Sequence, residues 1–188
     1  MLNSRKSWRI PAVLDRHVFL TGMAGCGKSS LGSRTACRMQ MPYLDMDEAL
    51  VKQFQLTVPE IFSRYGEEAF RKAETNLLIW LGSQHPMLVS TGGGCVMKPW
   101  NQQLMRSSGL IVLIDRPLDD ILKDIRLEDR PLLARNGAEG VRKMYQDRIS
   151  VYRSTADIIF PNTDALETSV QRLEQVLRQR FGLYRDGE

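Results

Sequence analysis

Eight residues near the start of this 188-residue chain form its strongest chemical motif. They match the phosphate-loop pattern G-x-x-x-x-G-K-[ST] and read Gly22-Met23-Ala24-Gly25-Cys26-Gly27-Lys28-Ser29. Glycines in such a loop let backbone N–H groups point at phosphate oxygens, and the helix that follows adds its positive dipole end. The lysine of this motif reaches the β- and γ-phosphates, and the hydroxyl after it ligates Mg²⁺. The motif therefore predicts a site for a nucleoside triphosphate.

Two carboxylates, Asp45 and Asp47, come at the end of the second apolar run of the chain. Strand alternation would put both on one side, at the carboxyl edge of a sheet where α/β proteins bind ligands. One carboxylate can hold Mg²⁺ through water, and the other can accept a hydroxyl proton as a general base. The alternative is that one of them caps the helix that follows, and both interpretations can hold together.

Three consecutive glycines, Gly92, Gly93 and Gly94, follow the third apolar run. They leave no side chain between backbone and ligand, so we expect N–H groups to approach a ligand closely there. Arg130 lies in a charge-rich stretch typical of a mobile lid, from which an arginine can neutralise a transferring phosphoryl group. The alternative for Arg130 is a surface arginine before a turn proline, and Arg148 taken alone is typical of a solvated helix face.

The elements that must position these residues are predicted from hydrophobic pattern. Helical patterns separate five short apolar runs, which predicts an α/β fold with a five-stranded parallel sheet flanked by helices. Helices are expected over 30–39 and, to close the fold, over 164–181. The expected strands are His17–Thr21, 42–46, 87–91, 110–115 and 157–160.

A helical insertion is expected between the second and third strands, over about 48–83. Thr57 and Glu60 form a capping box with a proline just inside the helix, and 69–81 has a strong helical pattern. The segment is too long for a plain crossover, so we interpret it as a second-substrate site, the alternative being a crossover without a ligand role. The expected organisation is a lead-in over 1–15, one domain over 16–181 with a lid at about 123–137, and a tail over 182–188.

Composition narrows the function classes. The net charge is +4, but the basic residues are spread along the chain, which favours a pocket for triphosphate and an acidic substrate over nucleic acid. No apolar run approaches the roughly 18 residues of a membrane helix. Three cysteines without close pairs argue against a disulfide framework, so we expect a cytoplasmic protein with no membrane or nucleic-acid partner.

The order of the motifs resembles the shikimate kinase family. Phe70-Arg71-x-x-Glu74, Arg130-Pro131-Leu132-Leu133 and Arg148-x-x-x-Tyr152 join the phosphate loop, the two aspartates and the three glycines. The resemblance covers about 18–177, nearly the whole chain. It implies transfer of a phosphoryl group from ATP to the 3-hydroxyl of shikimate, with Mg²⁺, in the shikimate pathway of aromatic amino acid biosynthesis, by a single-domain enzyme that we expect to be a monomer.

The resemblance also implies a role for each site residue. It implies catalytic roles for Lys28, Asp47 and Arg130, with Asp47 as the base. The implied ATP-binding residues are Gly25, Cys26, Gly27, Lys28, Ser29, Ser30 and Arg130, and the implied metal ligands are Ser29 and Asp45. The implied shikimate-binding residues are Asp47, Arg71, Glu74, Gly92, Gly93, Gly94 and Arg148, with the two arginines on the carboxylate.

Two alternatives and two departures accompany the resemblance. A kinase of another small hydroxy acid such as gluconate, or a nucleotide-binding relative without catalysis, shares much of the pattern. Lys123 stands nearest to the place where many relatives carry an adenine-stacking arginine. Cys26 occupies a loop position where serine or alanine is commoner, so we weigh a reactive thiol against a small residue that merely fits the turn.

Overall fold

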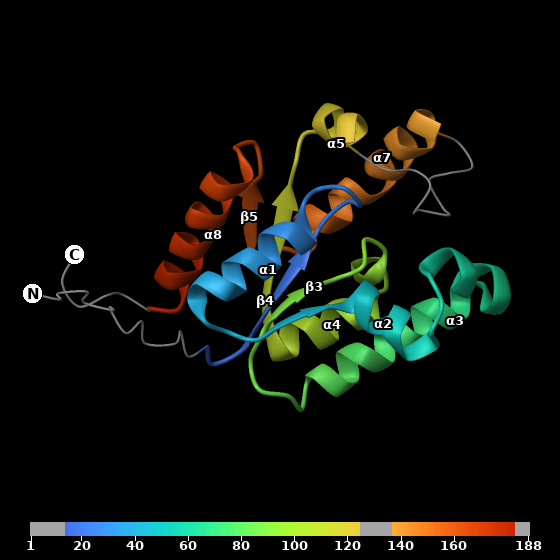
Figure 1. Cartoon of the computed structure of the whole chain (residues 1–188), viewed down its shortest axis with the longest axis horizontal. Helices are drawn as coiled ribbons and strands as arrows, with labels where there is room; N and C mark the ends of the chain where they lie inside the picture. The colour runs from blue at the N-terminus through green and yellow to red at the C-terminus, as the bar shows by residue number, and fades with distance from the viewer. Residues whose placement is uncertain (1–13, 125–136, 183–188) are drawn as a thin grey trace, which may run out of the picture.

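Five parallel strands form one sheet in the computed structural model, which describes residues 14–124 and 137–182 (Figure 1). The order across the sheet is β2-β3-β1-β4-β5, with β1 between β3 and β4. The predicted α/β fold with a five-stranded parallel sheet is therefore confirmed. The strands are β1 His17–Thr21, β2 Tyr43–Asp45, β3 Leu88–Ser90, β4 Gly109–Asp115 and β5 Ile158–Pro161.

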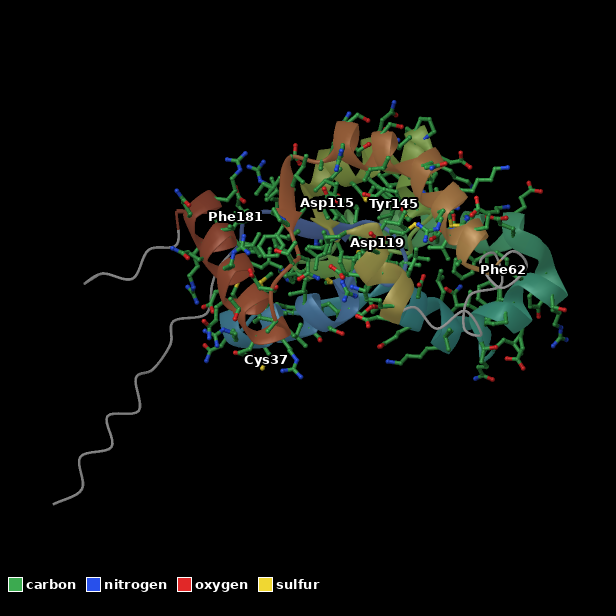
Figure 2. All side chains as sticks on the ribbon, turned by 90° about the horizontal axis from the view of Figure 1, so that it is seen from above. Cys37, Phe62, Asp115, Asp119, Tyr145 and Phe181 are labelled. Atoms are coloured by element: carbon green, nitrogen blue, oxygen red, sulfur yellow. The ribbon has the colours of Figure 1, made fainter. Side chains whose placement is uncertain are left out.

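Helices cover both faces of the sheet. Helices α1, Lys28–Met39, and α8, Leu166–Arg180, lie side by side on one face, while α4, Pro99–Ser108, and α7, Gly137–Thr155, lie on the other (Figures 1 and 2). All five residues of β1 are buried as a result. A strand covered on both faces needs a continuous apolar run, which is why its bounds could be predicted.

Helices α2, Met46–Phe54, and α3, Val58–Leu81, form the insertion between β2 and β3. The capping box at Thr57 is present, because its N–H donates to Glu60 Oε2 at 2.7 Å while Glu60 N–H donates to Thr57 Oγ1 at 3.4 Å. Gly66, with φ 81° and ψ 165°, breaks α3 into two helical parts. The insertion has a small core of its own, formed by Leu50, Ile61, Phe70 and Ala73.

The boundary between β2 and α2 corrects one prediction. Asp45 ends the strand, and Asp47 lies in the first turn of α2 instead of on the strand beside it. The reason is capping, since Asp45 Oδ1 accepts from the backbone N–H groups of Asp47 and Glu48 at 3.0 and 3.2 Å and so starts the helix. The capping alternative for Asp45 is confirmed.

The remaining described elements are the 3₁₀ turn η1, Cys95–Met97, and helix α5, Leu118–Asp124. The expected lid, which includes Arg130, falls almost wholly within residues 125–136. These residues, like 1–13 and 183–188, lie outside the described part of the chain. Among the described helices, none is long and apolar enough to cross a membrane.

Candidate active site

The phosphate loop and the three glycines meet at the carboxyl edge of the sheet. The loop follows β1 and the glycines follow β3, and the chain order reverses at β1, a place where open α/β sheets bind ligands. A cavity of about 280 Å³ opens there. Its lining residues are Gly25, Gly27, Lys28, Ser29, Ser30, Asp45, Asp47, Thr91, Gly93 and Arg116.

Glycine conformation gives the phosphate loop its shape. Gly22, Gly25 and Gly27 have φ of 136°, 80° and 98°, values that side chains with a Cβ rarely adopt. Gly27 is also the residue from which α1 begins. The loop therefore turns sharply and directs the N-terminus of α1 at the cavity.

Lys28 lies against the inside of this loop. Its ammonium donates to the carbonyls of Gly22 and Met23 at 3.0 and 2.9 Å, and only 9% of the residue is exposed. These contacts hold the positive charge at the cavity wall, beside the backbone N–H groups of the loop. Cation and oriented amides together make an anion-binding surface.

The Cys26 thiol is buried inside the turn, 3.8 Å from Lys28 Nζ. A Cβ on Gly22 would lie 3.0 Å from its sulfur, so the loop closes tightly around it. This packing favours the small residue that fits the turn over a thiol open to reagents. Cys26, Cys37 and Cys95 are all free of disulfides.

Ser29, Asp45 and Tyr43 form a polar group beside the loop. Ser29 Oγ donates to Asp45 Oδ2 at 2.6 Å, while the other oxygen of Asp45 caps α2. The Tyr43 hydroxyl lies 3.3 Å from the same Oδ2, and burial raises the pKa of this phenol to about 12, which keeps it neutral. Tyr43 is not among the predicted site residues, although its place two residues before Asp45 on one strand was a usable signal.

Gly92 and Gly94 allow three charged side chains to approach the backbone of the loop between β3 and η1 closely. A Cβ at Gly92 would lie 2.4 Å from Glu74 Oε1 and 2.8 Å from Asp47 Oδ1, and one at Gly94 would lie 2.4 Å from the Arg71 guanidinium. Any larger residue would push these groups away. The glycines therefore serve the neighbouring side chains as well as the expected approach of a ligand.

Arg71 and Glu74 form a buried ion pair on α3. Arg71 donates to Glu74 Oε2 at 2.8 Å and to Glu67 Oε1 at 3.0 Å. Burial raises the pKa of Glu74 to about 6 in spite of the arginine, and the nearby Asp47 adds to the rise. Glu74 Oε1 is buried and has no hydrogen-bond partner among the described residues.

Arg148 and Tyr152, one turn apart on α7, reach the same glycines from the other side. The Tyr152 hydroxyl donates to the Gly93 carbonyl, and Arg148 lies 3.5 Å from that oxygen. Arg148 is therefore not the solvated helix residue that its sequence context alone suggests. The structure thus brings together, around Gly92–94, side chains from segments that are far apart in the sequence. They are Asp47, Arg71, Glu74 and Arg148.

Two residues that are not among the predicted site residues hold the phosphate loop from the β4 and β5 side. Arg116 donates to the Gly25 carbonyl at 3.1 Å, and Asn162 donates to the Cys26 carbonyl at 2.9 Å. Each follows the end of a strand, a position at which a polar residue in this fold is worth testing. Lys123, by contrast, is exposed on α5 and pairs with Asp120 instead of lining the cavity.

Comparison with known proteins agrees with this geometry. The family model described as shikimate kinase matches residues 24–178. The shikimate kinase of Geobacter sulfurreducens is 34% identical over 178 residues, which cover 93% of this chain and 94% of that protein. The enzyme of Clostridium beijerinckii is 33% identical over 164 residues, 87% of this chain and 96% of the relative.

Solved structures lead to the same family. The shikimate kinase of Acinetobacter baumannii, in complex with shikimate, superposes with a TM-score of 0.81 at 27% identity, covering 89% of this chain and 94% of that one. The shikimate kinase of Aquifex aeolicus gives a TM-score of 0.73 at 30% identity, with 87% and 97% coverage.

Proposed function

We propose, since the chain belongs to the shikimate kinase family, that it transfers the γ-phosphoryl group of ATP to the 3-hydroxyl of shikimate. The family uses ATP as its co-substrate. The observation that carries the proposal is the position of the glycine loop. Gly93 lines the phosphate-loop cavity, while Gly92 and Gly94 lie against Asp47, Glu74 and Arg71. Donor and acceptor sites therefore share one wall.

The acceptor's carboxylate is the group that Arg71 and Arg148 are suited to hold. Both guanidinium groups lie at the Gly92–94 loop, one from α3 and one from α7. Planar guanidinium forks bind a carboxylate with two parallel hydrogen bonds, which fixes its orientation as well as adding affinity. Glu74 supports the site by holding Arg71 in place at 2.8 Å.

Asp47 has the position of the group that orients and deprotonates the reacting hydroxyl. Its carboxylate lines the nucleotide cavity and approaches Gly92, so it touches both halves of the site. A base must lie within hydrogen-bond reach of the proton that it accepts, and a residue shared by the two halves meets that requirement. The proton would pass from the 3-hydroxyl to an oxygen of Asp47 as the new P–O bond forms and the bond from the γ-phosphorus to the bridging oxygen of ADP breaks.

Ser29 and Asp45 fit a Mg²⁺ ion. Their two oxygens are 2.6 Å apart on the cavity wall, and Mg²⁺ is held in kinases by one or two such ligands plus water and phosphate oxygens. When bound, such an ion would neutralise charge on the phosphate oxygens.

Lys28 neutralises phosphate charge from inside the loop. Arg130 would do so from the family's lid, but it lies outside the described residues and its role rests on the sequence motif. A monomeric enzyme remains part of the proposal. The cytoplasmic location is proposed from the sequence, in which three cysteines occur without close pairs.

A coupled assay of ADP release tests the function and its two alternatives. We expect ATP turnover by the purified chain to depend on shikimate and to stay near background with gluconate or with no acceptor. Faster turnover with gluconate would assign the site to another hydroxy acid. ATP binding without turnover on either acid would identify a relative without catalysis.

A further inference from the structure

Arg116 brings a cation to the wall of the nucleotide cavity from the end of β4. It directly follows the last residue of β4, and its guanidinium is one of the groups that line the cavity. Its NH1 group donates to the carbonyl of Gly25 at 3.1 Å, and its side chain is 22% exposed. The cation is thus fixed against the loop that provides the phosphate-binding amides.

The guanidinium also pairs with Asp124, the last residue of α5. The two contacts to Gly25 and Asp124 use two of the five N–H donors of an arginine within the described residues. The Asp124 side chain is 60% exposed, and ion pairs of exposed carboxylates contribute little because water and salt screen them. A more highly charged anion in the cavity can therefore compete with Asp124 for the guanidinium.

We propose that Arg116 binds the phosphate chain of ATP and ADP, and that Asp124 competes with the nucleotide for the same guanidinium. The inference rests on the nucleotide binding proposed above. Arginine matches phosphate oxygens with paired donors, and its cation adds to the charge of Lys28, which lines the same cavity. Lys123, the nearest sequence match to an adenine-stacking arginine, pairs with Asp120 on the surface.

Substitution of Asp124 distinguishes an Arg116 that binds phosphate from an Arg116 that only supports the phosphate loop. If Arg116 only supported the loop, Asp124 would be needed to hold it against the Gly25 carbonyl, so the loss of either residue would weaken nucleotide binding. A phosphate ligand in competition with Asp124 gives opposite signs for the two substitutions. Arg153→Ala is the matched control, because it removes a guanidinium that pairs with the neighbouring Asp115 at 3.1 Å and does not line the cavity.

Calorimetric titration of ADP and of pyrophosphate into the full-length protein tests the proposal. We expect Arg116→Ala to weaken both ligands about tenfold, as for a lost hydrogen bond to a charged group. Asp124→Asn should tighten both about twofold and have no effect in the Arg116→Ala background. Shikimate affinity should not change, and Arg153→Ala should stay within about twofold of the wild type.

Three results would overturn the inference while wild-type binding stands. They are an unchanged affinity in Arg116→Ala, a parallel loss in Asp124→Asn, and a loss for ADP without a loss for pyrophosphate, which would assign Arg116 to the base. Failure of the wild-type protein to bind ADP would instead overturn the nucleotide site itself.

Discussion

At the scale of single residues, Asp47 is the side chain that touches both halves of the site. Asp47→Asn keeps the shape but removes the proton acceptor, so we expect turnover to fall by about 10²–10⁴-fold, the usual contribution of a general base. ATP affinity should change little. Steady-state kinetics with a parallel ATP titration checks this, and a variant that keeps more than about a tenth of wild-type kcat contradicts the base assignment.

The arginine pair belongs to the same scale. Arg148→Ala should weaken shikimate by about 2–5 kcal/mol while leaving ATP affinity almost unchanged, because a charge-assisted contact to a carboxylate is lost. Arg71→Ala alone would leave the buried Glu74 without its partner, so it is best made together with Glu74→Gln. Titration calorimetry measures the loss, with Arg64→Ala on the same helix as the control.

Equally tight shikimate binding by the Arg148→Ala protein and by the Arg71→Ala, Glu74→Gln protein would rule out a carboxylate clamp. A loss shared equally by ATP and shikimate would point to general damage of the fold instead.

Glu74 gives the folded protein a specific pH dependence. Its pKa rises from 4.5 to about 6 on folding because the carboxyl is buried. Between these values the folded state keeps a proton that the unfolded chain has lost, so stability falls as pH rises through this window. The free energy of unfolding should fall by about 2 kcal/mol across this window. Urea unfolding of wild type and Glu74→Gln from pH 4.5 to 7 measures it.

The free energy of unfolding of the wild type minus that of Glu74→Gln should fall as pH rises, should still be falling at the folded-state pKa of about 6, and should level off only about one unit above it. A difference that does not change with pH would mean that Glu74 ionises at its ordinary pKa. Subtracting the Glu74→Gln curve removes the contribution of the other titrating groups.

At the scale of elements, Gly66 decides how α3 presents Arg71. Its φ of 81° and ψ of 165° lie in a region reserved for glycine, and a Cβ there would meet nothing within 4 Å. Gly66→Ala should therefore cost about 1–3 kcal/mol through backbone strain alone. Gly82→Ala, at a φ of −57°, is the matched control and should change stability by less than about 1 kcal/mol.

Urea denaturation of both variants measures these free energies. A Gly66→Ala protein as stable as the Gly82→Ala protein would mean that α3 is free to straighten at this position. A raised KM for shikimate in Gly66→Ala alone would show in addition that the kink helps to place Arg71.

The strands and the capping box were predictable because local rules control them. Burial on both faces forces a continuous apolar run such as β1, and Thr57 with Glu60 satisfies helix-start amides within four residues. The start of α2 was predicted wrongly because two local signals compete at 45–47. Strand alternation would continue the strand, whereas the Asp45 carboxylate ends it by accepting backbone N–H groups.

At the scale of the whole molecule, the site is assembled from segments that only the topology brings together. The order β2-β3-β1-β4-β5 puts the Gly92–94 loop beside the phosphate loop, and α7 then lays Arg148 over Gly93. Motif order pointed to the family, and the comparisons confirm it. The positions of Arg116 and Tyr43 on the strands marked them as worth testing, but their contacts with Gly25 and Asp45 could not be predicted, because only the folded sheet brings these partners together.

Identification of the product tests the central claim most directly. The full-length protein, Mg²⁺, ATP and one equivalent of shikimate would be followed by phosphorus NMR, with Asp47→Asn as the matched control. The account predicts one ADP for each shikimate that gains a phosphate, carried on its 3-hydroxyl, and little product from the variant. Release of inorganic phosphate without phosphorylated shikimate, or a phosphate on another hydroxyl, would contradict it.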